Sequence, residues 1–165
     1  MNSFYLEFRG YWRDQKREML PNLPGIYCVY RSGVSCVDEV NYPLQLLYMG
    51  ESETPRDEIL SHEFRTQWES CLKGDEELMY TYAPIQKFRR QVYAAMIFQH
   101  RPVLNEEFNY LYPFPRTAVA VSGRTRFLKV SFIVPDELQA RSRVLLFQHP
   151  GLRTRLFASK KLRSV

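Results

Sequence analysis

The apolar residues at the start of the chain recur at the spacing of a helix. These positions are Phe4, Phe8, Tyr11 and Trp12. Intervals of three and four residues place side chains on one helical face. The run ends at the sequence PNLPG, which is typical of a turn. The pattern predicts an N-terminal helical arm over residues 1–22, packed against the rest of the chain.

Short segments rich in β-branched and aromatic residues follow, and each predicts a β-strand. They cover residues 26–30, 44–49, 78–83, 117–121 and 127–134. The last two segments flank a Ser-Gly-Arg sequence and predict a β-hairpin. The even-numbered side chains of the final segment are the more apolar, so we expect them to be the more buried.

Two helices are predicted between these strands. The first begins at Pro55, because proline suits the first helical turn and the carboxylates of Asp57 and Glu58 complement the helix dipole. It ends at Gly74, and the second helix covers residues 86–100. The order β-β-α-β-α predicts an α/β fold in which helices cover a small sheet. No glycine-rich dinucleotide motif or P-loop is present.

Composition narrows the class of protein. The chain has 165 residues, of which 45% are hydrophobic, so a real core is expected. No run of about 18 apolar residues exists, and the N-terminus lacks the layout of a signal peptide. The three cysteines, Cys28, Cys36 and Cys71, are odd in number and too scattered for a zinc site. These features predict a cytoplasmic protein that does not enter a membrane.

The charge is concentrated at the C-terminus. The chain has a formal net charge of +5, yet residues 138–165 contain seven basic residues and no acidic ones. Residues 1–137 are therefore close to neutral. A basic stretch predicts an anionic partner, with nucleic acid first, and a solvated tail is the alternative. The seven residues are Arg141, Arg143, Arg153, Arg155, Lys160, Lys161 and Arg163.

Three short motifs stand in order along the chain. The sequence GIY ends at Tyr27 in the first predicted strand, YMG begins at Tyr48 in the second, and RPVLN ends at Asn105 after the second long helix. In this order and structural context the motifs resemble those of the GIY-YIG nuclease family, with YMG in place of YIG. The resemblance covers about residues 23–107.

The resemblance implies a small central antiparallel sheet flanked by helices. Residues 23–116 would form this core, preceded by the helical arm, and residues 117–165 would add the hairpin and the basic extension within one compact domain. Members of the family hydrolyse phosphodiester bonds in DNA with one divalent metal ion, so Mg²⁺ or Mn²⁺ is expected if the chain is active. The resemblance assigns retained family positions to Tyr27, Tyr48, His62 and Asn105.

Two charged family positions are substituted. Glu58 stands where the family has an arginine that stabilises the phosphate, and Tyr93 stands where it has the glutamate that holds the metal. Losing a preorganised donor to a developing anion costs roughly 10²–10³ in rate. The resemblance and these substitutions together predict a domain that binds nucleic acid, DNA in preference to RNA, with phosphodiester cleavage lost or strongly reduced.

Two alternatives stay open. The first is an active nuclease with a rearranged site, in which Glu58 would be the metal ligand. The second is a protein-interaction or regulatory module on a retired nuclease fold, whose basic segment would meet an acidic protein. Besides the C-terminal residues, the candidate cations for nucleic acid are Arg56, Arg65, Arg89 and Arg90.

Overall fold

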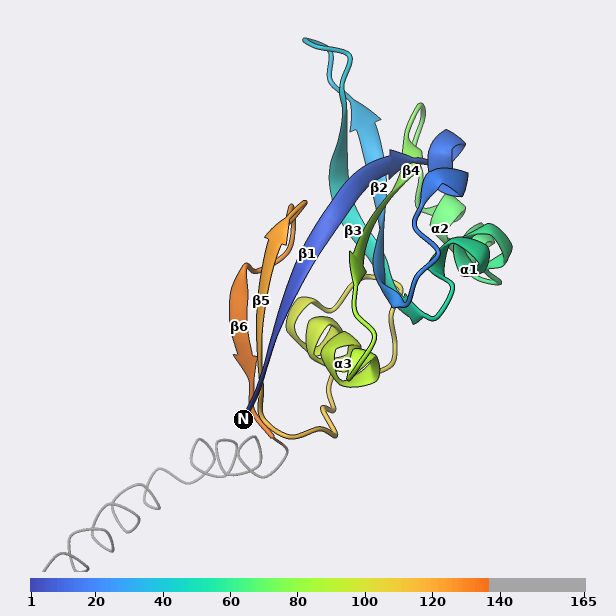
Figure 1. Cartoon of the computed structure of the whole chain (residues 1–165). Coiled ribbons are helices and arrows are strands. Elements are labelled where there is room, and N and C mark those ends of the chain that lie inside the picture. Colours follow the sequence, from blue (N-terminus) through green and yellow to red (C-terminus); the bar gives the residue numbers. More distant parts are fainter. Residues whose placement is uncertain (137–165) are drawn as a thin grey trace, which may run out of the picture.

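The strands of residues 1–136 form one six-stranded sheet in the order β3-β2-β4-β1-β5-β6 (Figure 1). The computed structural model describes residues 1–136. Its elements are β1 (Asn2–Arg13), the 3₁₀ helix η1 (Asp14–Met19), β2 (Gly25–Val34), β3 (Asn41–Ser52), α1 (Pro55–Ser61), α2 (Arg65–Ser70), β4 (Glu77–Pro84), α3 (Arg89–His100), β5 (Thr117–Gly123) and β6 (Ser131–Val134).

Helices cover both faces of this sheet. Neighbouring strands run antiparallel, except that β1 and β5 are parallel. The helix α3 packs on one face in a core shared with β5 and β6, and α1, α2 and η1 lie over the other face. The fold is therefore a mixed α/β arrangement, as the sequence pattern predicts. No helix within residues 1–136 is long and apolar enough to cross a membrane.

The strand β2 shows why its sequence is apolar without interruption. Ile26, Cys28 and Tyr30 belong to the core under α3, whereas Tyr27 and Val29 belong to the core under α1 and α2. Successive side chains of a strand point to opposite faces, so a strand covered on both faces has no polar side. All five residues are fully buried.

The prediction of an N-terminal helical arm is wrong for residues 2–13, which form the strand β1 between β4 and β5. Only residues 14–19 are helical, in η1. The interval of four residues between Phe4 and Phe8 fits a strand as well as a helix. Four residues are two full periods of a strand and close to one helical turn of 3.6 residues. Leu6, buried together with Phe8, is the position that distinguishes them.

The single helix expected after Pro55 is divided into α1 and α2. The break lies at His62, whose backbone is extended and whose Nδ1 accepts a hydrogen bond from the Phe64 backbone N–H at 3.0 Å. A side chain that satisfies a backbone N–H in this way competes with the helical hydrogen bond. The helix expected at 86–100 begins later, at Arg89.

The chain's last two described strands pair antiparallel, β5 with β6. The second is shorter than the predicted 127–134, because residues 124–130 form the connection. Phe132 and Val134 in β6 are buried and Ile133 is exposed, as the alternation predicts. Val130 is 60% exposed, because it precedes the strand. The seven basic residues of 138–165 lie outside the described residues.

Candidate functional site

The two motif tyrosines lie on neighbouring strands and on the same face of the sheet. Tyr48 on β3 is opposite Val29 on β2, two residues from Tyr27. The rings of Tyr27 and Tyr48 have centroids 6.3 Å apart. Tyr27 is fully buried, whereas Tyr48 is partly exposed and lines a small pocket. The pairing of the two strands thus places the two tyrosines together but gives only Tyr48 access to solvent.

The glycine of YMG is explained by packing against Tyr27. A Cβ atom at Gly50 would lie 2.1 Å from Cζ of the Tyr27 ring, far inside any van der Waals contact. Gly50 is opposite Tyr27 in the β2–β3 pairing. The glycine therefore allows the buried ring to cross the neighbouring strand, and this motif position has a structural reason that is independent of any chemistry.

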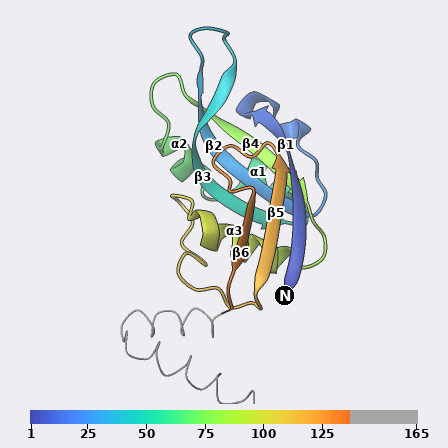
Figure 2. The ribbon, with the colours of Figure 1, turned by 90° about the vertical axis from the view of Figure 1, so that its left-hand side faces the viewer.

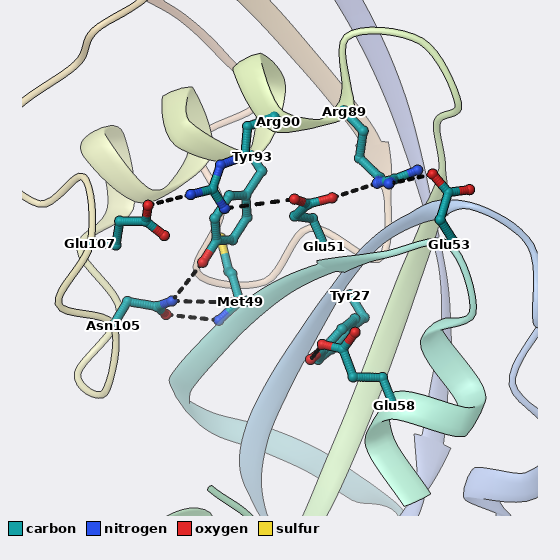
Figure 3. A network of polar contacts seen from close by, with 10 residues as sticks. All are labelled: Tyr27, Met49, Glu51, Glu53, Glu58, Arg89, Arg90, Tyr93, Asn105 and Glu107. Atoms are coloured by element: carbon teal, nitrogen blue, oxygen red, sulfur yellow. Dashed lines mark hydrogen bonds and ion pairs between the residues drawn. The ribbon is translucent and has the colours of Figure 1, made fainter. Parts of the chain in front are cut away.

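Glu58 contacts the first motif tyrosine directly. Its Oε1 accepts a hydrogen bond from the Tyr27 hydroxyl at 2.7 Å, across from α1 to β2 (Figure 3). Burial raises the pKa of Tyr27 well above its usual value, and the negative charge of Glu58 raises it further. The same two causes raise the pKa of Tyr48 to about 12. Both phenols are therefore protonated near neutral pH, and the Tyr27 hydroxyl donates its proton to the hydrogen bond with Glu58.

His62 is held by aromatic packing beside the tyrosines. Its ring centroid lies 4.4 Å from that of Trp68 and 5.3 Å from that of Tyr48. Burial lowers the pKa of His62, and the nearby Glu58 opposes this shift. Since Nδ1 accepts the Phe64 N–H, the neutral ring carries its proton on Nε2, which is 3.9 Å from Glu58. The histidine thus lies near the carboxylate, at a distance too long for a hydrogen bond.

Asn105 fastens the segment after α3 to the edge strand β3. Its Oδ1 accepts the Met49 backbone N–H and its Nδ2 donates to the Met49 carbonyl, both at 2.9 Å. The adjacent Leu104 N–H donates to the Leu47 carbonyl at 2.9 Å. These bonds occupy backbone groups that an edge strand would otherwise leave open. The role of Asn105 is structural, and the resemblance implies the same role.

Tyr93, at the position where the resemblance implies a glutamate, lies on α3 next to Asn105. The Asn105 Nδ2 donates to the Tyr93 hydroxyl at 3.3 Å, and the Tyr93 ring packs edge-on against Phe108. Tyr93, Asn105 and Tyr48 line one pocket of about 270 Å³. Neither Tyr27 nor Glu58 contributes to its lining. The structure thus brings together three of the six residues chosen from the sequence and leaves the Tyr27–Glu58 pair beside them.

The arginines at the start of α3 are engaged by carboxylates. Arg89 binds both Glu51 and Glu53, the latter at 2.7 Å, and Arg90 binds Glu51 and Glu107. Figure 3 shows Glu51 between the two guanidinium groups. Sequence analysis missed these three glutamates. The sequence GESE, directly after YM, was the available signal for two of them.

The remaining candidate cations are engaged as well. Arg65 forms ion pairs with Asp14 at 2.8 Å and Glu69 at 2.9 Å and also donates to the Tyr80 hydroxyl. Arg56 lies 3.8 Å from the adjacent Asp57. None of the four arginines proposed from the sequence within residues 1–136 is therefore free of a carboxylate.

The carboxylates nearest the tyrosines are already engaged by other side chains. A hard cation requires several oxygen ligands. In the part of the chain that the structure describes, no three His, Cys, Asp or Glu residues are grouped so that they could hold one. Glu58 is bonded to Tyr27, and Glu51 is bonded to two arginines.

Comparisons of the chain with protein-family models, with curated proteins and with solved structures found no match.

Proposed function

We propose that this chain binds nucleic acid on a GIY-YIG-like scaffold and that its phosphodiester cleavage is lost or strongly reduced. The scaffold part of the proposal is supported by the segment β3-β2-β4. It is an antiparallel three-stranded unit with Tyr27 on its central strand, and helices lie over both of its faces. This agrees with the small helix-flanked sheet that the resemblance implies.

The hydrogen bond from Tyr27 to Glu58 is the main observation that supports the proposed loss of cleavage. It places a carboxylate where the resemblance implies a cation, on the hydroxyl that would face the phosphate. Phosphoryl transfer needs positive charge where negative charge develops. A carboxylate there repels the phosphate, and replacing the family's metal ligand by Tyr93 removes a second requirement. Losing the cation alone costs at least roughly 10²–10³ in rate. Losing the metal ligand should cost more still.

Charge supports the binding part of the proposal. Residues 138–165 carry seven positive charges, while residues 1–137 contain 16 basic and 18 acidic residues. Neutralising phosphates with lysine and arginine releases counterions and yields binding that weakens steeply with salt. DNA is expected over RNA, because the family that the motifs resemble acts on DNA.

Binding and cleavage assays on the whole chain test the proposal. We expect DNA binding that falls with salt concentration, and no cleavage of duplex, single-stranded or branched DNA with Mg²⁺ or Mn²⁺. A matched control replaces the seven basic residues of 138–165 by glutamine and should lose most of the salt dependence. Absence of binding to any DNA or RNA would overturn the proposal and favour a protein-interaction module. Efficient cleavage by the unmodified chain would instead establish a rearranged active site.

A further inference from the structure

A second concave region lies away from Tyr27 and Tyr48, at the end of the sheet where the β2–β3 hairpin projects. The connection between β5 and β6 approaches the hairpin at this end (Figure 2). Between them is a cleft of about 460 Å³. Its lining includes Tyr11, Arg13, Tyr42, Met79, Arg124 and Arg126. The cleft thus combines three arginines with two tyrosines, drawn from β1, β3 and the β5–β6 connection.

Two of these arginines carry uncompensated charge. Among residues 1–136, neither Arg124 nor Arg126 forms an ion pair with a carboxylate. Arg13 at the rim is bound to Glu77 at 2.6 Å and contributes less. Eight of the described arginines are paired with acids, so the location of two unpaired ones in a single cleft sets this region apart.

Aromatic rings lie beside both free arginines. The Arg126 guanidinium carbon is 5.9 Å from the ring centroid of Tyr42 and 5.5 Å from that of Phe127. The Arg124 guanidinium carbon is 5.6 Å from the Tyr11 ring centroid. Tyr42 is 36% exposed and Phe127 47% exposed. Exposed rings next to unpaired guanidinium groups are the combination that binds single-stranded nucleic acid, because rings stack on bases and cations bind phosphates.

The backbone holds this arrangement in place. Arg124 Nε donates to the Gly10 carbonyl at 2.7 Å, which leaves its two terminal nitrogens available. The Arg126 backbone N–H donates to the Tyr11 hydroxyl at 3.3 Å. Both arginines are therefore anchored to β1, and the ends of their side chains remain exposed. Anchored donors lose less conformational freedom when they bind a ligand.

We infer that this cleft binds a single-stranded segment of nucleic acid, with Arg124 and Arg126 on backbone phosphates and Tyr42 and Phe127 stacked on unpaired bases. The inference rests on the proposed function and names the surface that performs it. A volume of about 460 Å³ falls in the range of small-molecule sites. A cleft of this size admits a nucleotide unit. A duplex is not expected to bind there, because its bases are already stacked and paired and have no free faces for the rings.

The test uses the whole chain and a fluorescent single-stranded oligonucleotide in DNA and RNA form, with duplex of the same sequence. The double variant Arg124→Ala with Arg126→Ala should lower the slope of log affinity against log salt by about 1.4, since each lost phosphate contact removes about 0.7 for a single strand. The matched control removes two exposed charges elsewhere, with Lys16→Ala and Lys87→Ala, and should leave single-strand binding close to that of the unmodified chain.

Stacking is tested without changing charge. Tyr42→Ala should weaken single-strand binding roughly tenfold, and Tyr42→Phe should retain it, because a base stacks on either ring. Neither change should affect duplex binding through the basic C-terminal segment. A 5-iodouracil oligonucleotide irradiated in the complex should crosslink to the peptide containing Tyr42 or Phe127. If Arg124→Ala disturbs folding through Gly10, Arg126→Glu replaces it, with Lys87→Glu as the control.

The outcomes separate this inference from the proposed function. If the unmodified chain binds single strands with salt dependence and all cleft variants bind equally well, the inference is overturned and the proposed function stands. If the unmodified chain binds no nucleic acid, both fail. Displacement of the oligonucleotide by poly-glutamate at the same charge concentration would show that the cleft recognises negative charge on a polypeptide, and would also overturn the inference.

Discussion

The region around the motif tyrosines and the cleft at the β2–β3 hairpin differ in how their charges are arranged. At the first region, Arg89 and Arg90 are neutralised by three glutamates, and Glu58 is bonded to a buried phenol. At the second, Arg124 and Arg126 have no carboxylate partner among the described residues and lie beside exposed rings. A nucleic acid would meet compensated charge at the first region and free positive charge at the second.

At the first region, two motif positions have a reason in packing alone. Gly50 accommodates the Tyr27 ring, and Asn105 closes the open edge of β3. Both positions would be required in this fold whether or not the chain cleaved DNA. A residue that served only chemistry would have no such packing reason, and the resemblance implies catalytic charges at two other positions, those of Glu58 and Tyr93.

The largest expected effect is on stability at the motif region. Gly50→Ala forces a Cβ atom against the fully buried Tyr27 ring, and overpacking of this kind should lower the free energy of unfolding by about 3 kcal/mol. Urea unfolding followed by tryptophan fluorescence measures it. The control is Gly74→Ala, where a Cβ would meet no atom within 4 Å and only the positive φ of 57° is unfavourable. Equal losses in the two variants would contradict the packing explanation.

The next effect separates the two regions directly. Asn105→Asp removes the donor to the Met49 carbonyl and places a carboxylate against it, which should cost about 2–3 kcal/mol of stability in a buried site. Arg126→Ala, at the exposed cleft, should change stability by no more than about 0.5 kcal/mol. Thermal and urea unfolding of both variants provide the measurement. A cleft variant as destabilised as the Asn105 variant would remove the distinction between a packed region and a binding region.

Releasing the arginines of α3 should make the first region more like the second. Glu51→Gln removes the carboxylate shared by Arg89 and Arg90, and should raise DNA affinity about fivefold. This factor corresponds to about 1 kcal/mol for a unit charge near a phosphate in water. Fluorescence anisotropy at low salt measures it. The control, Glu63→Gln, changes the net charge equally and should raise affinity less, because Glu63 is exposed and separate from this cluster.

The smallest effect concerns titration beside Glu58. Because its negative charge opposes formation of a second anion, Glu58→Gln should lower the pKa of Tyr48 from about 12 toward its ordinary value. The same change should lower the pKa of His62 further, because Glu58 stabilises the charged ring. Near-ultraviolet titration, with Tyr48→Phe identifying the signal, and NMR of the histidine ring measure the two shifts. Absence of both shifts would place Glu58 away from these rings.

The lowered pKa of His62 also predicts the direction of a pH effect on stability. The unfolded chain, with an ordinary histidine pKa near 6.5, binds the proton more readily than the folded chain. The contribution of His62 is therefore complete above this pH and is lost as the pH falls below it. Replacing Glu58 by glutamine should steepen the loss, and His62→Gln should remove this part of the dependence.

The sequence by itself was sufficient for the α/β class and for most of the central strands. Largely apolar segments such as 26–30 and 78–83 are strands because both faces of the sheet are covered, and this pattern is local. The sequence was insufficient for β1, since the interval from Phe4 to Phe8 suits two periodicities. It also missed the division at His62, which depends on one side chain accepting a backbone N–H.

Charge compensation was decided only by the tertiary structure. Arg65 and Asp14 are 51 residues apart in the chain, and Arg89 and Glu51 are 38 residues apart, yet each pair forms an ion pair. Sequence analysis could count the arginines but could not determine which of them would be neutralised. The cleft of Tyr42, Arg124 and Arg126 is likewise assembled by the pairing of distant strands. Composition determines how many charges a chain has, whereas the fold determines which of them remain free, because electrostatic pairing depends on distances of a few ångströms in space.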